Sequence, residues 1–323
     1  MRRRSFITLI GGALAWPVAA RAQQAGRTYR LGALTPSPRS APQMIALFDE
    51  LRQLGFIEGQ NLTVDWRTYG QNIERVFEFA TELSKSQVDV IVAGGDAGIR
   101  AVRQVTSTIP ILGLTEDMVR SGMVRSLARP GGNITGVSLL ATELDGKRQD
   151  ILIEAVPALR RMAALADNNA TEPRQLQALQ VAARARGVEL SIHQVAKPGE
   201  IAAALEVAKK ADAAALNVLA SPLLFANRQI ILDRAAALRL PAIYQWPEVA
   251  EQGGFVGYGP RVVQLFRDVM ARQLAKLLRG ANPSDLPVEQ PTKFELVINL
   301  RTAKAIGHEV PAGLVLRADK VIE

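Results

Sequence analysis

Short apolar runs alternate with longer amphipathic stretches along most of this chain. Such short runs are typical of buried strands, and the stretches between them carry the 3.6-residue apolar period of a helix. In Pro42–Leu54 the apolar residues recur on one helical face until Gly55 ends the pattern. The first group of predicted strands is Tyr29–Leu34, Leu62–Trp66, Val88–Ala93, Ile109–Leu114 and Ile134–Leu139. The predicted helices between them are Pro42–Leu54, Ile73–Lys85, Gly98–Thr106 and Val119–Ala128.

The same alternation then starts again. The second group of predicted strands is Met162–Ala166, Val188–Val195, Ala213–Leu219 and Pro241–Tyr244, with Phe255–Gly257 as a candidate fifth. Its predicted helices are Glu172–Arg186, Glu200–Lys210 and Pro222–Leu238. Strands that alternate with helices of this length form parallel sheets covered on both faces. Two successive groups therefore predict an α/β protein with two doubly wound, Rossmann-like lobes.

The C-terminal part of the chain does not fit a simple tandem of two lobes. A helix over Val262–Leu278 is followed by extended segments at Leu286–Pro291 and Phe294–Leu300 and by a helix over Thr302–Ile306. Elements left over after two complete lobes predict that the chain crosses between the lobes three times. We expect lobe 1 to comprise 27–139 plus 258–284, and lobe 2 to comprise 140–257 plus 285–323. Lobes joined in this way form a hinge, and a hinge implies a cleft between them.

The first 22 residues have the three parts of a signal peptide. Arg2–Arg4 form a positive region, Phe6–Ala20 is an uncharged and mostly apolar run, and Ala20–Ala22 is a small-x-small cleavage site. The apolar run is shorter than the roughly 20 residues that span a bilayer as a helix, so we expect no membrane anchor. A buried N-terminal helix is the alternative, but it would contain two glycines and a proline. Arg3-Arg4-Ser5-Phe6-Ile7 also fits the twin-arginine pattern, and both export routes stay open.

Composition narrows the class of protein further. Removing residues 1–22 would take away four arginines and reduce the formal net charge from +8 to +4, without leaving a basic run. An ordinary solvated surface then explains the charge, and no nucleic-acid partner is expected. The chain has no cysteine, which excludes thiol catalysis, cysteine metal sites and a lipid-modified N-terminal cysteine. We therefore expect a protein that is free in a bacterial periplasm.

Candidate binding residues follow the predicted strands. In open parallel sheets, ligands bind beyond the carboxyl ends of the strands, where helix N-termini offer unpaired N–H groups. In the first lobe these positions are Ser37, Gly94, Gly95, Asp96, Thr115, Glu116 and Asp117. In the second lobe and beside a crossing they are Asn168, Ala220, Ser221, Tyr244, Trp246 and Tyr258.

Each candidate also has a purely structural interpretation. Gly94–Asp96 could be a plain turn with a helix cap, and its spacing does not match the G-x-G-x-x-G dinucleotide fingerprint. Asp117 could cap a helix that starts at Val119, or it could pair with a ligand ammonium. The three aromatic residues could pack between the lobes or form a stacking wall for a ligand.

Catalytic patterns are poorly represented. His193 falls in a predicted strand and His308 in the C-terminal segment, and neither belongs to a triad-like arrangement. No G-x-S-x-G elbow, H-E-x-x-H motif or cluster of metal ligands occurs in the sequence. We therefore expect no enzyme, no metal and no cofactor.

Four segments resemble one family. They are SLARPGGNITGVS at Ser126–Ser138, LPVEQPTKFELVINLRTAKAIG at Leu286–Gly307, LGFIEGQNL at Leu54–Leu62 and RADKVIE at Arg317–Glu323. Together they resemble the substrate-binding proteins of ABC transporters that have a type I periplasmic-binding fold. The resemblance implies that a small solute is captured between two lobes and that the protein then docks on an inner-membrane permease, as a monomer. Solutes known in this family include aromatic amino acids.

The resemblance extends to the candidate loops, with two departures. Thr115–Asp117 matches the family's T-D-P-like loop, and Gly94–Asp96 matches its small polar loop after the third strand. Relatives often carry Ser or Thr with Pro in that second loop, whereas this chain has Gly95-Asp96-Ala97. Where relatives often show a D-N-T-like loop, this chain has Ala220-Ser221-Pro222. These departures leave the identity of the solute open.

The sequence thus predicts a periplasmic solute-binding protein that closes on an amino acid or a small aromatic carboxylate. The helix N-termini beyond Gly95 and Ser221 would bind the carboxylate, Asp117 would face an ammonium, and the aromatic residues would provide apolar surface. Two alternatives remain, namely a periplasmic sensory module and a periplasmic hydrolase or isomerase. A signal peptide in the place of a helix-turn-helix domain argues against a DNA-binding regulator of the same shape.

Overall fold

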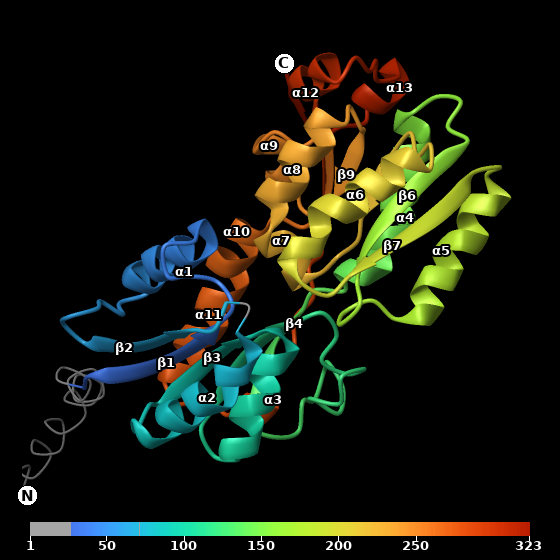
Figure 1. Ribbon diagram of the computed structural model, residues 1–323. Coiled ribbons are helices and arrows are strands. Elements are labelled where there is room, and N and C mark those ends of the chain that lie inside the picture. The colour runs from blue at the N-terminus through green and yellow to red at the C-terminus, as the bar shows by residue number, and fades with distance from the viewer. Residues whose placement is uncertain (1–26, 71) are drawn as a thin grey trace, which may run out of the picture.

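Two separate sheets organise the chain in the computed structural model, which describes residues 27–70 and 72–323 (Figure 1). The predicted signal peptide, residues 1–22, lies outside the described residues. All helices in the described part of the chain are too short or too polar to cross a membrane.

The first sheet has five parallel strands in the order β2-β1-β3-β4-β5. They are β1 (Tyr29–Thr35), β2 (Leu62–Thr68), β3 (Val90–Gly94), β4 (Ile111–Thr115) and β5 (Ile134–Ser138). Helices α2 (Val76–Lys85) and α3 (Gly95–Val105) pack against each other beside the sheet. Helix α1 (Pro42–Gln53) packs instead with α10 (Val262–Leu265) and α11 (Ala271–Leu278), which Figure 1 shows in orange beside it. These layers bury the apolar runs that predicted the strands.

The second sheet has seven strands in the order β12-β11-β10-β9-β8-β6-β7. They are β6 (Arg161–Asp167), β7 (Glu189–Val195), β8 (Leu216–Val218), β9 (Ala242–Tyr244), β10 (Val256–Gly259), β11 (Glu295–Asn299) and β12 (Lys320–Ile322). Only the β10–β11 pair is antiparallel among these described strands. The helices of this lobe are α4 (Asp145–Ala155), α5 (Pro173–Ala185), α6 (Ile201–Lys210), α7 (Pro222–Ala226), α8 (Arg228–Ala237), α9 (Pro247–Glu251), α12 (Leu300–Ala305) and α13 (Ala312–Val315). The candidate fifth strand is β10.

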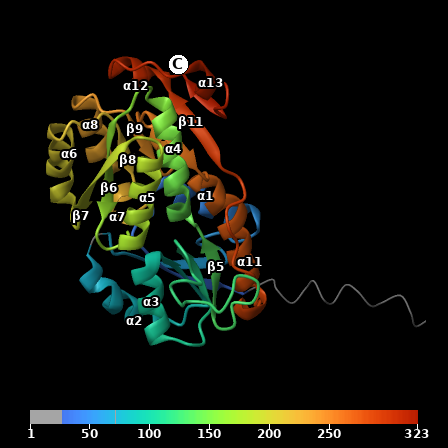
Figure 2. The same ribbon diagram turned by 90° about the vertical axis from the view of Figure 1, so that its right-hand side faces the viewer.

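The chain passes between the two lobes three times, after β5, after β10 and before β11 (Figures 1 and 2). Two of the boundaries differ from the predicted ones. Tyr258 and Gly259 belong to β10 in the second sheet, so the chain leaves this lobe after Gly259. Glu289 exchanges backbone hydrogen bonds with Gly136 and Ser138 at 2.9 and 3.0 Å, which keeps the segment before it beside β5 in the first lobe.

Two helix predictions were wrong in instructive ways. Residues 119–128 form turns instead of a helix, because the chain wraps around Met118, whose carbonyl accepts the N–H groups of Met123 and Val124. All three of these side chains are buried, at a spacing that a helix would not place on one face. The predicted helix over Pro222–Leu238 is divided at Asn227 into α7 and α8.

Helix α4 was not predicted at all. Its inner face carries Asp145, Arg148 and Gln149, which are fully buried beside Ile151 and Leu152. Charged and amide side chains on the buried face interrupt the apolar period by which sequence patterns reveal a helix. The same interruption marks α4 as unusual, since buried charges are rare unless they are paired.

Candidate functional site

The carboxyl ends of the strands in the two lobes face each other (Figure 2). Arg120, which follows β4 in the first lobe, forms an ion pair with Glu172, which follows β6 in the second. Both side chains are more than half exposed, so this pair adds little stability. The pair does show that the carboxyl ends of the strands in the two lobes lie close together. Most of the predicted site residues follow these strand ends.

In the first lobe, Asp96 holds two of the predicted loops together. Its carboxylate accepts hydrogen bonds from Thr115 Oγ1 and, at 2.9 Å, from Ser121 Oγ. Because Asp96 lies in the first turn of α3 while Thr115 ends β4, these bonds fix the loop after β4 against the N-terminus of α3. Ser37 lies at the end of β1, where its carbonyl accepts the hydroxyl of Thr35 at 2.7 Å.

The N-terminus of α3 is built by close backbone approaches. The Gly94 carbonyl accepts the phenolic O–H of Tyr69 at 2.7 Å. Gly95 has a φ of +72°, and a Cβ there would lie 2.9 Å from the Tyr69 hydroxyl. None of the described side chains caps this helix, so its first N–H groups point toward the strand edge. Such a terminus favours an anion.

The sequence pattern did not indicate Tyr69 as a site residue. It lies just after β2, and burial and the charge of Asp96 raise the pKa of its hydroxyl above the ordinary value, so it stays a donor. An aromatic residue directly before Gly70, at the end of a predicted strand, was the available signal.

Asp117 and Glu116 have different partners in the loop after β4. The Asp117 carboxylate accepts the N–H groups of Val119 and Arg120, both at 3.0 Å. It therefore caps a tight turn, in place of the helix predicted from Val119. Glu116 accepts the N–H of Thr142, which lies beyond the first crossing between the lobes. Burial raises the pKa of Glu116 to about 7.

The second lobe contains a buried ion pair that the sequence did not predict. Arg148 Nη1 donates to Asp145 Oδ1 at 2.6 Å, and neither side chain is exposed to solvent. Arg148 also donates to the carbonyls of Ala141 and Tyr258, each at 2.8 Å. Both carbonyls lie in the second lobe, Ala141 just after the first crossing and Tyr258 just before the second, so one guanidinium binds the chain next to two crossings. Desolvation raises the pKa of Asp145 to about 6, although the Arg148 charge opposes this change.

The loop after β8 is largely occupied by internal hydrogen bonds. Ser221 Oγ donates to Asp167 at 2.7 Å and accepts the N–H of Leu224 at 3.1 Å. The Ser221 N–H donates to Gln245 Oε1 at 2.9 Å, and the Ala220 N–H donates to Asp145 at 3.2 Å. The Ala220, Ser221 and Leu224 N–H groups at the predicted carboxylate site therefore already have partners within the protein. Asn168 lies after β6, with its N–H bonded to the Val195 carbonyl.

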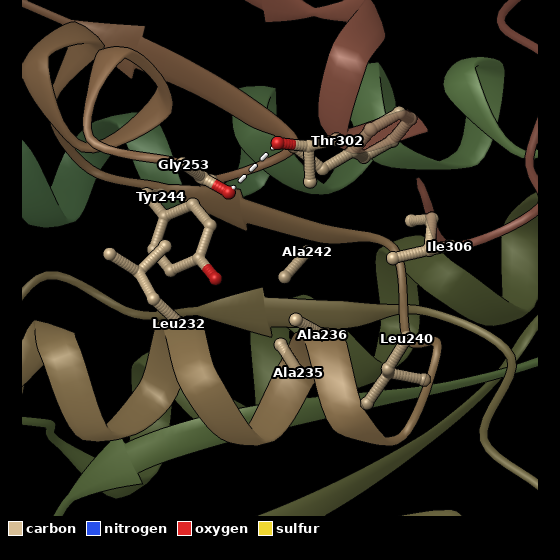
Figure 3. Close-up of a pocket in the computed structure, with 11 residues that line it drawn as sticks. Leu232, Ala235, Ala236, Leu240, Ala242, Tyr244, Gly253, Thr302 and Ile306 are labelled. Carbon is tan, nitrogen blue, oxygen red and sulfur yellow. Dashed lines mark hydrogen bonds between the residues drawn. The ribbon is translucent and has the colours of Figure 1, made fainter. Parts of the chain in front are cut away.

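The three predicted aromatic residues do not form one wall. Tyr244 is buried and lines a small cavity of about 10 Å³, room for one water, which Leu232 and Thr302 also line (Figure 3). Trp246 is 5% exposed and packs edge-on against Phe225, at 6.0 Å between ring centroids. Its Nε1 has no hydrogen-bond partner within the described residues.

Tyr258, the third aromatic residue, lies apart from the other two. It is partly buried beside Phe294, with 6.5 Å between the ring centroids, near the second and third crossings. Its backbone carbonyl, which Arg148 binds, contributes to the hinge.

A second hollow lies away from the facing edges. It has a volume of about 670 Å³ and is lined by Arg125, Ser126, Ala128, Arg129, Gly131, Ser284 and Asp285. These residues come just before β5 or just before the extended segment that begins at Leu286. These two parts of the chain lie side by side, and both belong to segments that resemble the family. Thr135 Oγ1 donates to the Leu286 carbonyl at 2.7 Å, which joins the same two segments. Two of the segments that resemble the family thus pack against each other next to the third crossing.

The described residues offer no group of three or more His, Cys, Asp or Glu side chains that could hold a metal ion. His193 lies 3.0 Å from Ser191, but both sit within the edge strand β7 and not at the strand ends. His308 contacts the Ala155 carbonyl at 2.8 Å. Neither histidine lies near the facing carboxyl ends of the strands.

Two lobes of this topology, joined by three crossings with facing strand ends, define a binding protein of the type I periplasmic-binding class. The family comparison agrees with this class. The family model described as "ABC transporter substrate binding protein" matches residues 42–322, and the chain belongs to this family. Its members are substrate-binding proteins and not enzymes.

The individual relatives share only a low sequence identity with this chain. A tyrosine-binding protein from Clostridioides difficile (strain R20291) is 24% identical over 260 residues, which cover 79% of this chain and 74% of the relative. A conserved domain protein from Vibrio cholerae has a TM-score of 0.83 at 22% identity and covers 91% of this chain and 100% of its own. An ABC domain in complex with L-Trp from Streptococcus pneumonia has a TM-score of 0.78 at 20% identity, with the same coverage. At these identities, the structures show that the fold is shared.

Proposed function

We propose that this protein is a periplasmic solute receptor for an ABC uptake transporter and that it binds an amino acid with an aromatic side chain. The observation that carries the proposal is the uncapped N-terminus of α3, which adjoins the loop that carries Asp117. Asp96 ties these two features together, so an anion-binding and a cation-binding group lie on adjoining loops. An α-amino acid carries both complementary charges. The aromatic preference is supported by the tyrosine- and L-Trp-binding relatives.

Closure of the lobes would enclose the solute. We propose that residues 27–139 with 260–289 and residues 140–259 with 290–323 move as two bodies about the three crossings. The N-terminal segment, with its twin-arginine-like pattern, would direct export. A monomer that carries its solute in the cleft would then dock on an inner-membrane permease.

Asp117→Asn tests the assignment of the ammonium site. Asparagine keeps the side-chain oxygen that accepts the Val119 and Arg120 N–H groups, so the turn should survive while the negative charge is lost. We expect the dissociation constant for L-tyrosine or L-tryptophan to rise about tenfold or more, which corresponds to roughly 1.4 kcal/mol. Isothermal titration calorimetry measures this change.

The matched control is Asp268→Asn, which removes the same charge from an exposed position in the helical segment between α10 and α11. Its affinity should equal that of the wild type. If Asp117→Asn binds as tightly as the control, Asp117 does not face the ammonium.

A further inference from the structure

Glu116 reaches across the first crossing between the lobes. It follows β4 in the first lobe, and its carboxylate accepts the N–H of Thr142 in the short turn Ala141–Leu144 that leads into α4 of the second lobe. The backbone reinforces this contact, because the N–H groups of Leu139 and Leu140 donate to the carbonyls of Thr115 and Glu116, each at 2.9 Å. A hinge motion at this crossing therefore changes the surroundings of the Glu116 carboxyl.

Those surroundings disfavour a negative charge. Glu116 is partly buried, and the charged groups that face it are Asp145 and Arg148, both from α4. Asp145 repels a second negative charge, whereas Arg148 and the Thr142 N–H favour it. Desolvation is the largest effect, so the pKa lies at about 7, compared with an ordinary 4.5.

Asp145 provides an internal contrast. Its pKa is also raised by burial, but its partners Arg148, Gln175 and Ala220 all belong to the second lobe. These partners move together with Asp145, so the hydrogen bonds of its carboxyl do not depend on the position of the lobes. Glu116 has its partner on the opposite side of the hinge.

At the second crossing, Glu248 is another carboxyl that accepts a backbone N–H from the opposite lobe. From α9 in the second lobe, it accepts the N–H of Val263 in α10 at 3.5 Å, beside Arg261 and Glu251. Burial raises the pKa of this carboxyl as well. Its longer contact is the weaker of the two.

We propose that Glu116 couples protonation to lobe closure: its carboxyl takes up a proton from solvent when the lobes close on a solute and releases it when they part. The inference rests on the proposed solute-binding function. In this structure Arg120 and Glu172 bridge the strand ends and Glu116 is desolvated against Thr142, as the proposal requires of the closed arrangement. Parting the lobes would hydrate the carboxyl.

The sign of the pH effect follows from this difference. A carboxyl with a raised pKa in the closed arrangement favours closure below about 7 and loses that contribution as the pH rises through this value. If the carboxyl returns to 4.5 when the lobes part, solute binding should be about tenfold tighter at pH 6 than at pH 8. Binding at pH 7 should then take up about half a proton.

Calorimetric titration with L-tryptophan at pH 7, in two buffers of different ionisation enthalpy, measures the proton count. The wild type should take up protons, and Glu116→Gln, which keeps an acceptor for Thr142 without the charge, should lose at least half of this uptake. Glu143→Gln is the matched control, because it removes an exposed carboxyl one residue from Thr142. It should behave as the wild type. Equal proton uptake in Glu116→Gln and the wild type would overturn the inference and leave the proposed function intact.

If L-tryptophan gives no binding heat, the aromatic amino-acid form of the proposed function fails, and the solute-free protein decides about Glu116. Small-angle scattering should then give a larger radius of gyration at pH 8 than at pH 6 for the wild type. Glu116→Gln should give the same radius at both values. A wild-type radius that does not change with pH would contradict the coupling.

Discussion

Arg148→Ala should lower the free energy of unfolding by about 3–5 kcal/mol, the usual result of removing one partner from a buried ion pair. The loss would leave the Asp145 carboxylate buried without its counter-charge. It would also free the carbonyls of Ala141 and Tyr258, which lie next to two crossings between the lobes. Urea denaturation followed by circular dichroism measures the loss. Any protein that remains folded should bind solute more weakly, because two hinge segments lose a shared partner.

A second pair of variants keeps this prediction testable even if Arg148→Ala does not fold. Asp145→Leu combined with Arg148→Met replaces both charges with apolar side chains, and it should recover at least half of the lost stability. Arg174→Ala, at an exposed position on α5, should change stability by less than about 0.5 kcal/mol. Wild-type stability in Arg148→Ala would contradict the assigned role.

Trp246→Ala should have a comparable effect, with a loss of about 3–5 kcal/mol, because it leaves a large cavity in a packed cluster. The indole is 5% exposed and packs on Phe225 of α7. Trp246→Phe should be tolerated far better, with a loss of about 1 kcal/mol, since the indole N–H has no partner to lose within the described residues. Thermal and urea unfolding of the two variants measure this difference.

Trp66→Ala is a suitable comparison for the same substitution. Trp66 lies partly exposed on the edge strand β2, and its Nε1 donates to Thr68 at 2.8 Å. Trp66→Ala should lower the free energy of unfolding clearly less than Trp246→Ala does. If Trp246→Phe is as damaging as Trp246→Ala, cavity formation does not explain the contribution of Trp246 to stability.

The fold was predictable because strands such as β1, β3, β4, β5 and β6 are almost completely buried and are therefore nearly continuous apolar runs. Tyr29–Leu34 was predicted as a strand, and β1 covers Tyr29–Thr35. Helix α4 could not be found in this way, because Asp145, Arg148 and Gln149 occupy its buried face. Their burial is tolerable only through tertiary hydrogen bonds to residues as distant as Gln175 and Tyr258.

The sequence indicated the location of the candidate site, but not the hydrogen-bond partners of its residues. The rule that ligands bind at strand carboxyl ends correctly brought Asp96 and Thr115 together, although 19 positions separate them. It could not tell which polar groups would be used up internally, as Ser221 is by Asp167 and Gln245. It also could not assign faces within the short strand β9, where successive side chains alternate, and Tyr244 lies in the core.

Solute binding by the purified wild-type protein tests the central claim most directly. Calorimetry with L-tryptophan and with L-tyrosine should give a saturable, one-to-one isotherm for at least one of them. At a free concentration 100 times the dissociation constant, that solute should stabilise the protein by about 2.7 kcal/mol and raise its melting temperature. Absence of heat and of a melting shift with both amino acids, and with small aromatic carboxylates, at millimolar concentrations would contradict the account.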